Sequence, residues 1–488
     1  MKKALGVLAL LGVGLLLVMT LRALMLPSRQ VDVDGPADAA PLDAAAMAAR
    51  LGEAIRFRTI SEQDGGDAHA EAFRGFEAFL VRSYPRVHAT LARERVDAHS
   101  LLYTWKGRGG GAGPLLLAAH HDVVPVEPGT EGDWQEPPFA GRVVDGVVWG
   151  RGALDDKGGL IAILEAVESL LAEGFTPPRD VYLAFGHDEE IGGSRGAVNI
   201  AATLAGRGVR LDAVVDEGGA VVEGMLDGVD GPIAVVGIAE KGSVSLKLTI
   251  RQDGGHSSTP PRHSAVGILA TAITRLEANP MPARFEGTTR QFLETLAPEL
   301  PFPLRLALSN LWITSGLLER VFRGVPPLDA MVRTTTAATI FHGGVKANVL
   351  PKQVEAVVNF RILPGDTIED VVTHVRRTID DERIEVEPTG ATKPRNPSGV
   401  SPVDSPAFEA LARAIRATYP KAIVVPYLVV GGTDARHYGA LTDDIYRFNG
   451  FHLGSDALKL AHGTNERLSA ENLEGGVRFF RTLLREER

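Results

Sequence analysis

The spacing of apolar residues predicts alternating strands and helices in the first half of the chain. Short, almost continuously apolar runs at 114–119, 181–185 and 211–215 are typical of buried strands. Between the first two runs, Leu, Ile and Val recur at helical spacing from Leu160 to Leu171, and Gly174 marks the helix end. Continuous apolar strands separated by helices indicate a sheet that is covered on both faces.

The pattern changes after residue 240. Residues 244–250 alternate between apolar and polar side chains, which is the period of a half-exposed strand. Later segments complete the order β-α-β-β-α-β, which predicts a ferredoxin-like unit with helices on one face of its sheet. These segments are a helix at 265–278, strands at 332–341 and 354–362, a helix at 368–379 and a strand at 383–387. Helix–strand alternation returns after about residue 401, with a helix at 407–418 and a strand at 423–430.

The N-terminal segment is apolar all round. Ala4–Leu21 holds eighteen residues without a charge and follows Lys2 and Lys3. This length is enough for a helix to cross a bilayer core. We expect an uncleaved anchor that leaves Lys2 and Lys3 in the cytoplasm and the rest of the chain outside it. A cleaved signal peptide, and hence a secreted protein, is the alternative.

Composition excludes several classes of protein. The 488 residues suffice for two or three domains. The absence of cysteine excludes disulfides, Cys-ligated metal sites and cysteine nucleophiles. The chain has 61 acidic against 51 basic residues, a formal charge of −10, which argues against a nucleic-acid partner.

Acidic and histidine residues gather where the predicted strands end. In open α/β sheets, ligands bind at the carboxyl ends of the strands. Carboxylates packed there would repel one another without a cation, and nitrogen and oxygen donors suit zinc. Any single pair is more simply explained as solvated loop acids, but the whole set favours a pair of divalent metals. The residues are His120, Asp122, Asp155, Asp156, Glu189, Glu190, Asp216, Glu217 and, near the C-terminus, His462.

Several segments together resemble motifs of the M20 family of zinc metallopeptidases. The family motifs match Ala119–Pro125, Gly150–Lys157, Gly186–Glu190 and Val215–Gly219, in the same order and spacing. The resemblance runs from about residue 45 to the end. Trp134–Phe139 and Ile340–Val349 are similar to the branch that contains carboxypeptidase S and the N-fatty-acyl-amino-acid synthase/hydrolases.

The resemblance implies a site with two Zn²⁺ ions per chain, with Co²⁺ or Mn²⁺ as alternatives. Glu189 would be the general base that activates the attacking water, and Asp122 would orient His120. The peptide bond after Asp155 would be cis. The implied ligands are Asp155 as the bridge, His120 and Asp216 for one ion, and Glu190 and His462 for the other.

The same resemblance assigns roles to the inserted unit, which would be a lid and dimerisation domain. His256 matches a histidine that stabilises the tetrahedral oxyanion, often from a partner subunit, so a homodimer is implied. Asn348 and Arg361 match substrate-contacting positions, and the planar guanidinium of Arg361 suits a free carboxylate. Gly431–Asp434 resembles a glycine loop near the site.

The predicted fold is α/β: a di-zinc peptidase domain with a mixed sheet, an inserted ferredoxin-like domain, and an N-terminal membrane helix. The expected ranges are 1–27 for the anchor or signal peptide, 28–42 for a linker, 43–238 and 396–488 for the catalytic domain, and 239–395 for the insertion.

The expected activity is hydrolysis of an amide bond next to a free carboxylate. The substrate would be a small molecule, either a peptide or an N-acyl amino acid. The apolar stretch Met281–Ala330 could wall a pocket for a large acyl group, or it could simply form packed helices. Two alternatives remain: a serine hydrolase using Ser194 in the Gly192–Gly196 motif, and a non-catalytic binding protein of the same fold.

Overall fold

A computed structural model describes residues 2–33, 38–63, 68–109, 111–224, 229, 231–390, 393–454 and 459–487. Of the predicted linker 28–42, residues 34–37 lie outside the described residues. Residues 28–33 of this predicted linker contact the body of the protein. The Gln30 side chain pairs with the backbone of Val424, accepting from its N–H at 2.8 Å and donating to its carbonyl at 3.0 Å.

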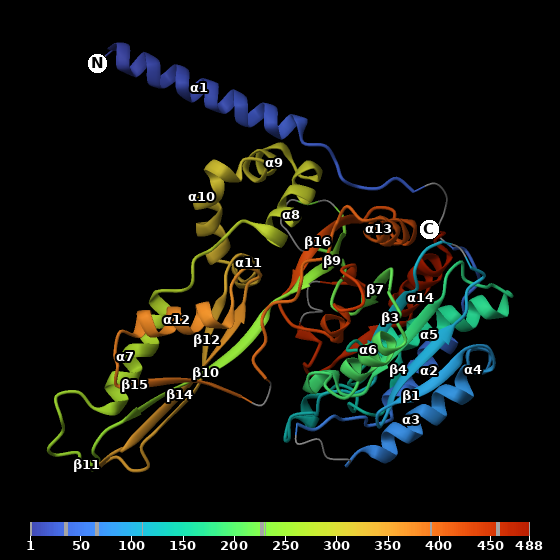
Figure 1. The fold of residues 1–488 in the computed structure, drawn as a ribbon, viewed down its shortest axis with the longest axis horizontal. Coiled ribbons are helices and arrows are strands. Elements are labelled where there is room, and N and C mark those ends of the chain that lie inside the picture. Colours follow the sequence, from blue (N-terminus) through green and yellow to red (C-terminus); the bar gives the residue numbers. More distant parts are fainter. Residues whose placement is uncertain are drawn as a thin grey trace.

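A ten-stranded mixed sheet forms the larger body of the molecule (Figure 1). The strand order is β1-β2-β6-β3-β7-β17-β9-β8-β18, and β16 pairs with β9 in parallel. β3 lies between β6 and β7, and both pairings are parallel. The bounds are β1 Ala92–Val96, β2 Ser100–Trp105, β3 Leu115–His120, β6 Val181–Gly186, β7 Ala213–Asp216, β8 Ala220–Val222, β9 Ile233–Glu240, β16 Ile423–Val429, β17 Ile445–Arg447 and β18 His452–Leu453.

Helices cover both faces of this sheet, as the apolar strands predict. Successive residues of β3 point to opposite faces: Leu115 and Leu117 join one apolar cluster, and Leu116 joins another. The first cluster is closed by α2 (Ala44–Ile55), α3 (Ala70–Ser83), α4 (Pro85–Thr90), α5 (Lys157–Ala172), α13 (Pro406–Thr418) and α14 (Ala470–Arg485). The second is closed by α6 (Ala197–Gly206) and the 3₁₀ helix η4 (Asp434–Tyr438).

The inserted segment forms a separate antiparallel sheet with the order β12-β14-β10-β15. This is the β-α-β-β-α-β order that the sequence predicts. Its apolar side chains face α7 and α12 in a cluster of their own. A capping box between Thr367 and Asp370 begins α12. The bounds are β10 Gly242–Arg251, α7 Ala265–Ala278, β12 Thr335–Gly343, β14 Gln353–Ile362, α12 Ile368–Ile379 and β15 Ile384–Thr389.

Four helices follow α7 and lie between the two sheets and the N-terminal helix (Figure 1). They are α8 (Gly287–Leu296), α9 (Phe302–Leu308), α10 (Leu311–Arg323) and α11 (Pro326–Val332). Phe292 and Leu296 of α8 are buried in one cluster with Val425 of β16. Small sheets complete the fold: β11 (Gly255–His256) with β13 (Val349–Leu350), and β4 (Arg142–Val144) with β5 (Val147–Trp149) and β19 (Arg467–Ser469).

The N-terminal helix α1 (Lys2–Met25) projects away from the body (Figure 1). Within the described residues it is the one helix long and apolar enough to cross a membrane, by length and composition. Most of its Leu and Val side chains are exposed, whereas Ala23 near its end is fully buried.

Candidate active site

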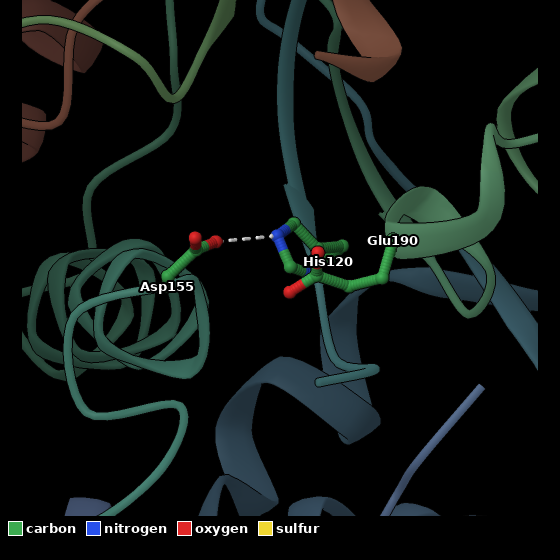
Figure 2. Close-up of side chains that lie close together, drawn as sticks. All are labelled: His120, Asp155 and Glu190. Carbon is green, nitrogen blue, oxygen red and sulfur yellow. Dashed lines mark hydrogen bonds and ion pairs between the residues drawn. The ribbon is translucent and has the colours of Figure 1, made fainter. Parts of the chain in front are cut away.

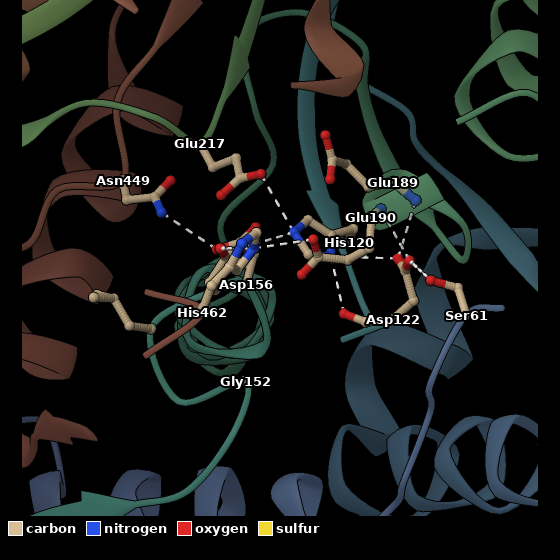
Figure 3. A network of polar contacts seen from close by, with 12 residues as sticks. Ser61, His120, Asp122, Gly152, Asp156, Glu189, Glu190, Glu217, Asn449 and His462 are labelled. Atoms are coloured by element: carbon tan, nitrogen blue, oxygen red, sulfur yellow. Dashed lines mark hydrogen bonds and ion pairs between the residues drawn. The ribbon is translucent and has the colours of Figure 1, made fainter. Parts of the chain in front are cut away.

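The carboxyl ends of parallel strands bring the predicted polar residues to one edge of the large sheet. β3 ends at His120, and its neighbours β6 and β7 lead into the segments that carry Glu190 and Glu217. Asp155 lies two residues before the start of α5. His120, Asp155 and Glu190 converge in Figure 2, and Figure 3 adds His462 from the segment after β18.

Asp155 lies between the two histidines. Its Oδ1 is 3.0 Å from Nε2 of His120, and its Oδ2 is 3.1 Å from Nε2 of His462. Each histidine also contacts a glutamate. Nε2 of His120 lies 3.3 Å from Glu217, and Nε2 of His462 lies 3.0 Å from Glu190. One carboxylate thus joins two groups that each contain a histidine and a glutamate.

The geometry favours Glu217 over the predicted Asp216 as the neighbour of His120. Side chains that follow one another in extended chain point to opposite sides, and Asp216 is the last residue of β7. Its carboxylate lies in the fields of Arg447, Glu240 and His120 but makes no contact with the imidazole, and its Oδ2 is buried without a hydrogen-bond partner among the described residues. The sequence motif contained both acids, but spacing alone could not choose between them.

Asp122 connects the imidazole of His120 to the loop that carries the paired glutamates. Nδ1 of His120 lies 3.3 Å from Oδ1 of Asp122 and 3.0 Å from the Asp122 carbonyl oxygen. The same carboxylate accepts hydrogen bonds from the backbone N–H groups of Glu189 (3.2 Å) and Glu190 (3.1 Å) and from Ser61 Oγ (2.7 Å). Asp122 therefore positions both the ring and the loop (Figure 3).

Burial and mutual repulsion give the acids of the site unusual pKa values. Burial raises the pKa of Glu190, and burial together with the charge of Asp155 raises the pKa of Glu217 to about 8. Hydrogen bonds with Asp155 and Glu190 raise the pKa of His462 to about 10. Glu190 Oε1 is also buried without a hydrogen-bond partner among the described residues. Clustered carboxylates, two imidazoles and an orphaned oxygen fit divalent cations such as zinc.

Glu189 adjoins this cluster. Three potential metal-binding atoms lie within 4.8 Å of one another here. They are a carboxylate oxygen of Glu189, a ring nitrogen of His120 and a carboxylate oxygen of Glu217. Burial raises the pKa of Glu189 well above its ordinary value. A carboxylate with a high pKa beside a reaction centre suits proton transfer near neutral pH.

Glu466 holds the loop that presents Asp155, a role that the sequence did not suggest. Its Oε1 accepts the backbone N–H groups of Gly152 (3.0 Å), Leu154 (2.9 Å) and Asp155 (3.1 Å), and its Oε2 lies 2.7 Å from Arg151. The peptide bond between Asp155 and Asp156 is cis, as the resemblance implies. The one sequence feature that could have pointed to Glu466 is its position four residues after His462.

The glycine loop Gly431–Asp434 contributes a buried acid. Asp434 lies against Gly193, where an added Cβ would meet Asp434 Oδ1 at 2.1 Å. Gly193 also has a φ of 67°, so both space and backbone require glycine there. Burial raises the pKa of Asp434 well above its ordinary value. The resemblance placed this loop near the site but assigned no role to its acid.

Two of the three predicted residues of the inserted segment, His256 and Asn348, lie apart from the cluster. His256 is exposed on β11, where it pairs with Val349, and its Nδ1 is 2.7 Å from Ser258 Oγ. Asn348 lies beside it, since its carbonyl accepts the N–H of Ser257 at 3.1 Å. Figure 1 places β11 at the far tip of the inserted sheet. Arg361 lies on β14, opposite Ser243 at the start of β10.

Two further expectations concern segments outside the cluster. Ser194 lies in an exposed turn before α6, separated from the end of β6 by η2 (Glu189–Ile191), so it lacks the strand–turn geometry of a nucleophile elbow. The stretch Met281–Ala330 forms packed helices. Phe292 and Phe322 are buried with β9 and β16, whereas Trp312 and Leu317 face outward.

Sequence relatives cover nearly the whole chain. A "Probable carboxypeptidase S-like 2" of Dictyostelium discoideum is 39% identical over 482 residues, which cover 97% of this chain and 92% of the relative. The human "N-fatty-acyl-amino acid synthase/hydrolase PM20D1" is 39% identical over 448 residues, covering 90% and 87% of the two chains.

A solved structure shares the fold. The M20 family metallo-carboxypeptidase Sso-CP2 of Sulfolobus solfataricus superposes with a TM-score of 0.64 at 19% identity, covering 90% of this chain and 98% of that one. The family model for peptidase family M20/M25/M40 matches residues 116–486. The chain is therefore an enzyme that belongs to peptidase family M20/M25/M40.

Proposed function

We propose that this enzyme uses two zinc ions to hydrolyse an amide bond next to a free carboxylate, as a carboxypeptidase or an N-acyl-amino-acid hydrolase. The observation that carries the proposal is the placement of Asp155, with one oxygen 3.0 Å from His120 and the other 3.1 Å from His462. A carboxylate in this position can join two cations.

The donors divide into two sets around Asp155. His120 and Glu217 would hold one ion, and Glu190 and His462 the other. Nitrogen and oxygen donors suit zinc, with Co²⁺ and Mn²⁺ as alternatives. When bound, such a pair supplies Lewis acidity to the amide carbonyl and lowers the pKa of water.

Glu189 would move the proton of the reaction. It would take a proton from the attacking water and return it to the amine that leaves when the amide carbon–nitrogen bond breaks. The contacts of Asp122 with the Glu189 and Glu190 amides would hold that carboxylate in place through the reaction.

The substrate would be a small molecule with a free carboxylate. Arg361 would pair with that carboxylate, and His256 and Asn348 would contact the substrate from a second copy of the chain, since they lie apart from this chain's own cluster. The name of the human relative supports a fatty-acyl amide, and that of the Dictyostelium relative supports a peptide.

The enzyme would be anchored by α1 with its catalytic domain outside the cytoplasm. The length and apolar composition of α1 support this assignment, and Lys2 and Lys3 would remain on the cytoplasmic side. If α1 were cleaved, the enzyme would be secreted instead.

A substrate panel tests the reaction and the substrate class. The zinc-loaded full-length enzyme in detergent is given dipeptides, N-acetyl amino acids and N-oleoyl amino acids, and the released amino acid is measured. We expect turnover that is fastest with the oleoyl series, is lost on chelation and returns with zinc. Retained turnover after verified metal removal would overturn the mechanism, and equal rates for acetyl and oleoyl substrates would overturn the acyl preference.

A further inference from the structure

Helix α10 is apolar on two opposite faces. Its inner face contributes Leu311, Leu318 and Phe322 to the cluster with β9 and β16. Its outer face remains exposed, with Trp312 at 57%, Leu317 at 65% and Val321 at 54% exposure. An exposed surface with several large apolar side chains commonly marks a site that contacts another protein or a membrane, so the outer face calls for a partner.

The composition of the outer face is that of a membrane-surface helix. The one acid of α10, Glu319, pairs with Arg333 at 3.4 Å. The exposed positions of α10 carry four apolar side chains, one glycine and two arginines. They are Trp312, Ile313, Gly316, Leu317, Arg320, Val321 and Arg323. Phe302 and Leu304 extend the apolar surface onto α9. Apolar side chains mixed with Trp and Arg are typical of helices that lie in the plane of the bilayer interface. We call this surface the α9–α10 face.

Polar contacts tie this surface to the end of the apolar helix α1. Arg305 of α9 donates to the carbonyl oxygens of Ala23 (2.5 Å) and Leu26 (2.8 Å), which are orphaned where α1 ends. Asn310, directly before α10, donates to the Met19 carbonyl at 3.1 Å, and its Oδ1 accepts from Trp312 Nε1 at 3.2 Å. Figure 1 shows α9 beside the C-terminal end of α1, and α10 leading from there away from α1.

These contacts set the depth of the α9–α10 face relative to the apolar run. Asn310 meets α1 at Met19, and the first charge after the apolar run is Arg22. Three residues of helix correspond to about 4.5 Å. The start of α10 therefore lies level with the end of the apolar run, where a spanning helix would leave the hydrocarbon and where tryptophan is enriched.

We propose that the α9–α10 face inserts into the interfacial layer of the lipid bilayer that α1 crosses. This inference rests on the proposed anchor. The occupant is lipid because the apolar surface is continuous with a helix that only lipid would cover, and because its charges are basic. Long-chain N-acyl amino acids that partition into the bilayer would then reach an enzyme held against the same surface.

The lack of cysteine allows a direct test, since a single introduced cysteine can be labelled without background. Three full-length variants carry a nitroxide: Leu317→Cys on the α9–α10 face, Leu10→Cys within α1, and Val143→Cys, an exposed position on β4 away from both. Each is reconstituted into vesicles of phosphatidylcholine and phosphatidylglycerol. Spin relaxation is then compared between oxygen, which concentrates in lipid, and a water-soluble nickel chelate.

We expect the labels at 317 and 10 to become accessible to oxygen and shielded from nickel, while the label at 143 stays accessible to nickel. Lipid contact at 10 with nickel access at 317 would overturn the inference and leave the anchor standing. Nickel access at both positions would overturn both. Spin–spin broadening at 317 without a gain in oxygen access would identify a second copy as the occupant and also overturn the inference.

Discussion

Asp216 and Glu217 are neighbours in the chain, but their carboxylates have different surroundings. Glu217 lies 3.3 Å from His120, and Asp216 lies in the field of Arg447. The sequence located this pair because acids after apolar strands gather at one sheet edge. The resemblance chose Asp216 as the metal ligand, whereas the geometry favours Glu217, because the choice depends on which residue ends β7 and on which side of the strand each side chain then points.

Paired substitutions test this assignment. Glu217→Gln removes a charged donor beside His120, so we expect bound zinc to fall from about two ions per chain toward one. Asp216→Asn leaves the donors in place and keeps both ions. Metal content is measured by mass spectrometry after dialysis against limited zinc. Zinc loss in the Asp216 variant alone would reverse the assignment.

The proton-transfer role proposed for Glu189 can be tested by measuring turnover and metal binding separately. Glu189→Gln preserves the shape of the side chain and removes its basic oxygen. We expect zinc content to stay near that of the parent enzyme while kcat falls by about 10²–10⁴. Steady-state kinetics with an N-acyl amino acid provide the measurement. A rate close to the parent value would rule out this role.

Lys241 predicts a pH dependence of stability away from the metal site. Its ammonium donates to the carbonyl oxygens of Ala330 (2.9 Å) and Arg333 (2.8 Å), but burial, reinforced by the charge of Arg361, lowers its pKa from 10.5 to about 7. Between these two pH values the unfolded chain binds more protons than the folded one. This lysine therefore makes stability rise with pH in that window.

Lys241→Met should remove that rise. We expect the slope of the unfolding free energy against pH, between about 7.5 and 9.5, to decrease by up to about 1.4 kcal/mol per pH unit. Chemical unfolding of both proteins at several pH values gives the two slopes. Lys247→Met, at a partly exposed lysine of β10, serves as the control and should leave the slope unchanged. Parallel slopes for the parent and the Lys241 variant would refute the lowered pKa.

At the level of helices and loops, local sequence signals specify most of the architecture. The predicted bounds of α7 and α12 agree with Ala265–Ala278 and Ile368–Ile379, because each combines an apolar stripe with a side-chain N-cap, Ser264 and Thr367. Short strands such as β11 and β13 escape prediction, since two residues carry no periodicity. The loop before α5 escapes as well, because its main acceptor, Glu466, comes from about 310 residues later in the chain.

Glu466→Gln tests how much that loop matters for the metal site. The Glu466 carboxylate accepts hydrogen bonds from three backbone N–H groups and from Arg151. A glutamine amide has one oxygen that can accept and would therefore keep only some of these hydrogen bonds. We expect zinc affinity to fall by about 10–100-fold, the scale of losing an outer-shell partner. Competition with a fluorescent chelator measures it. The exposed Glu471→Gln on α14 is the matched control, and equal affinities in the two variants would count against a positioning role.

The arrangement of the two sheets could be anticipated only in part. The β-α-β-β-α-β order of the insertion follows from the alternation of its strands. The contacts between α1 and α9 join residues about 280 positions apart, and such contacts leave no periodic signal in the sequence. The same holds for His256: its motif suggests catalysis, but only the fold places it at the tip of the inserted sheet, apart from the cluster of acids and histidines in its own chain.

Mixed dimers decide whether His256 acts across two copies of the chain. His256→Ala alone should lower kcat by about 10²–10³, the scale of losing one oxyanion donor. Glu189→Gln alone should also be nearly inactive. When equal amounts are unfolded together and refolded, about half of the dimers pair one chain of each kind. In those dimers the chain that keeps Glu189 receives His256 from its partner. One complete site per mixed dimer restores about a quarter of the parent activity, whereas a mixture no more active than the sum of its components would show that His256 does not serve a neighbouring copy.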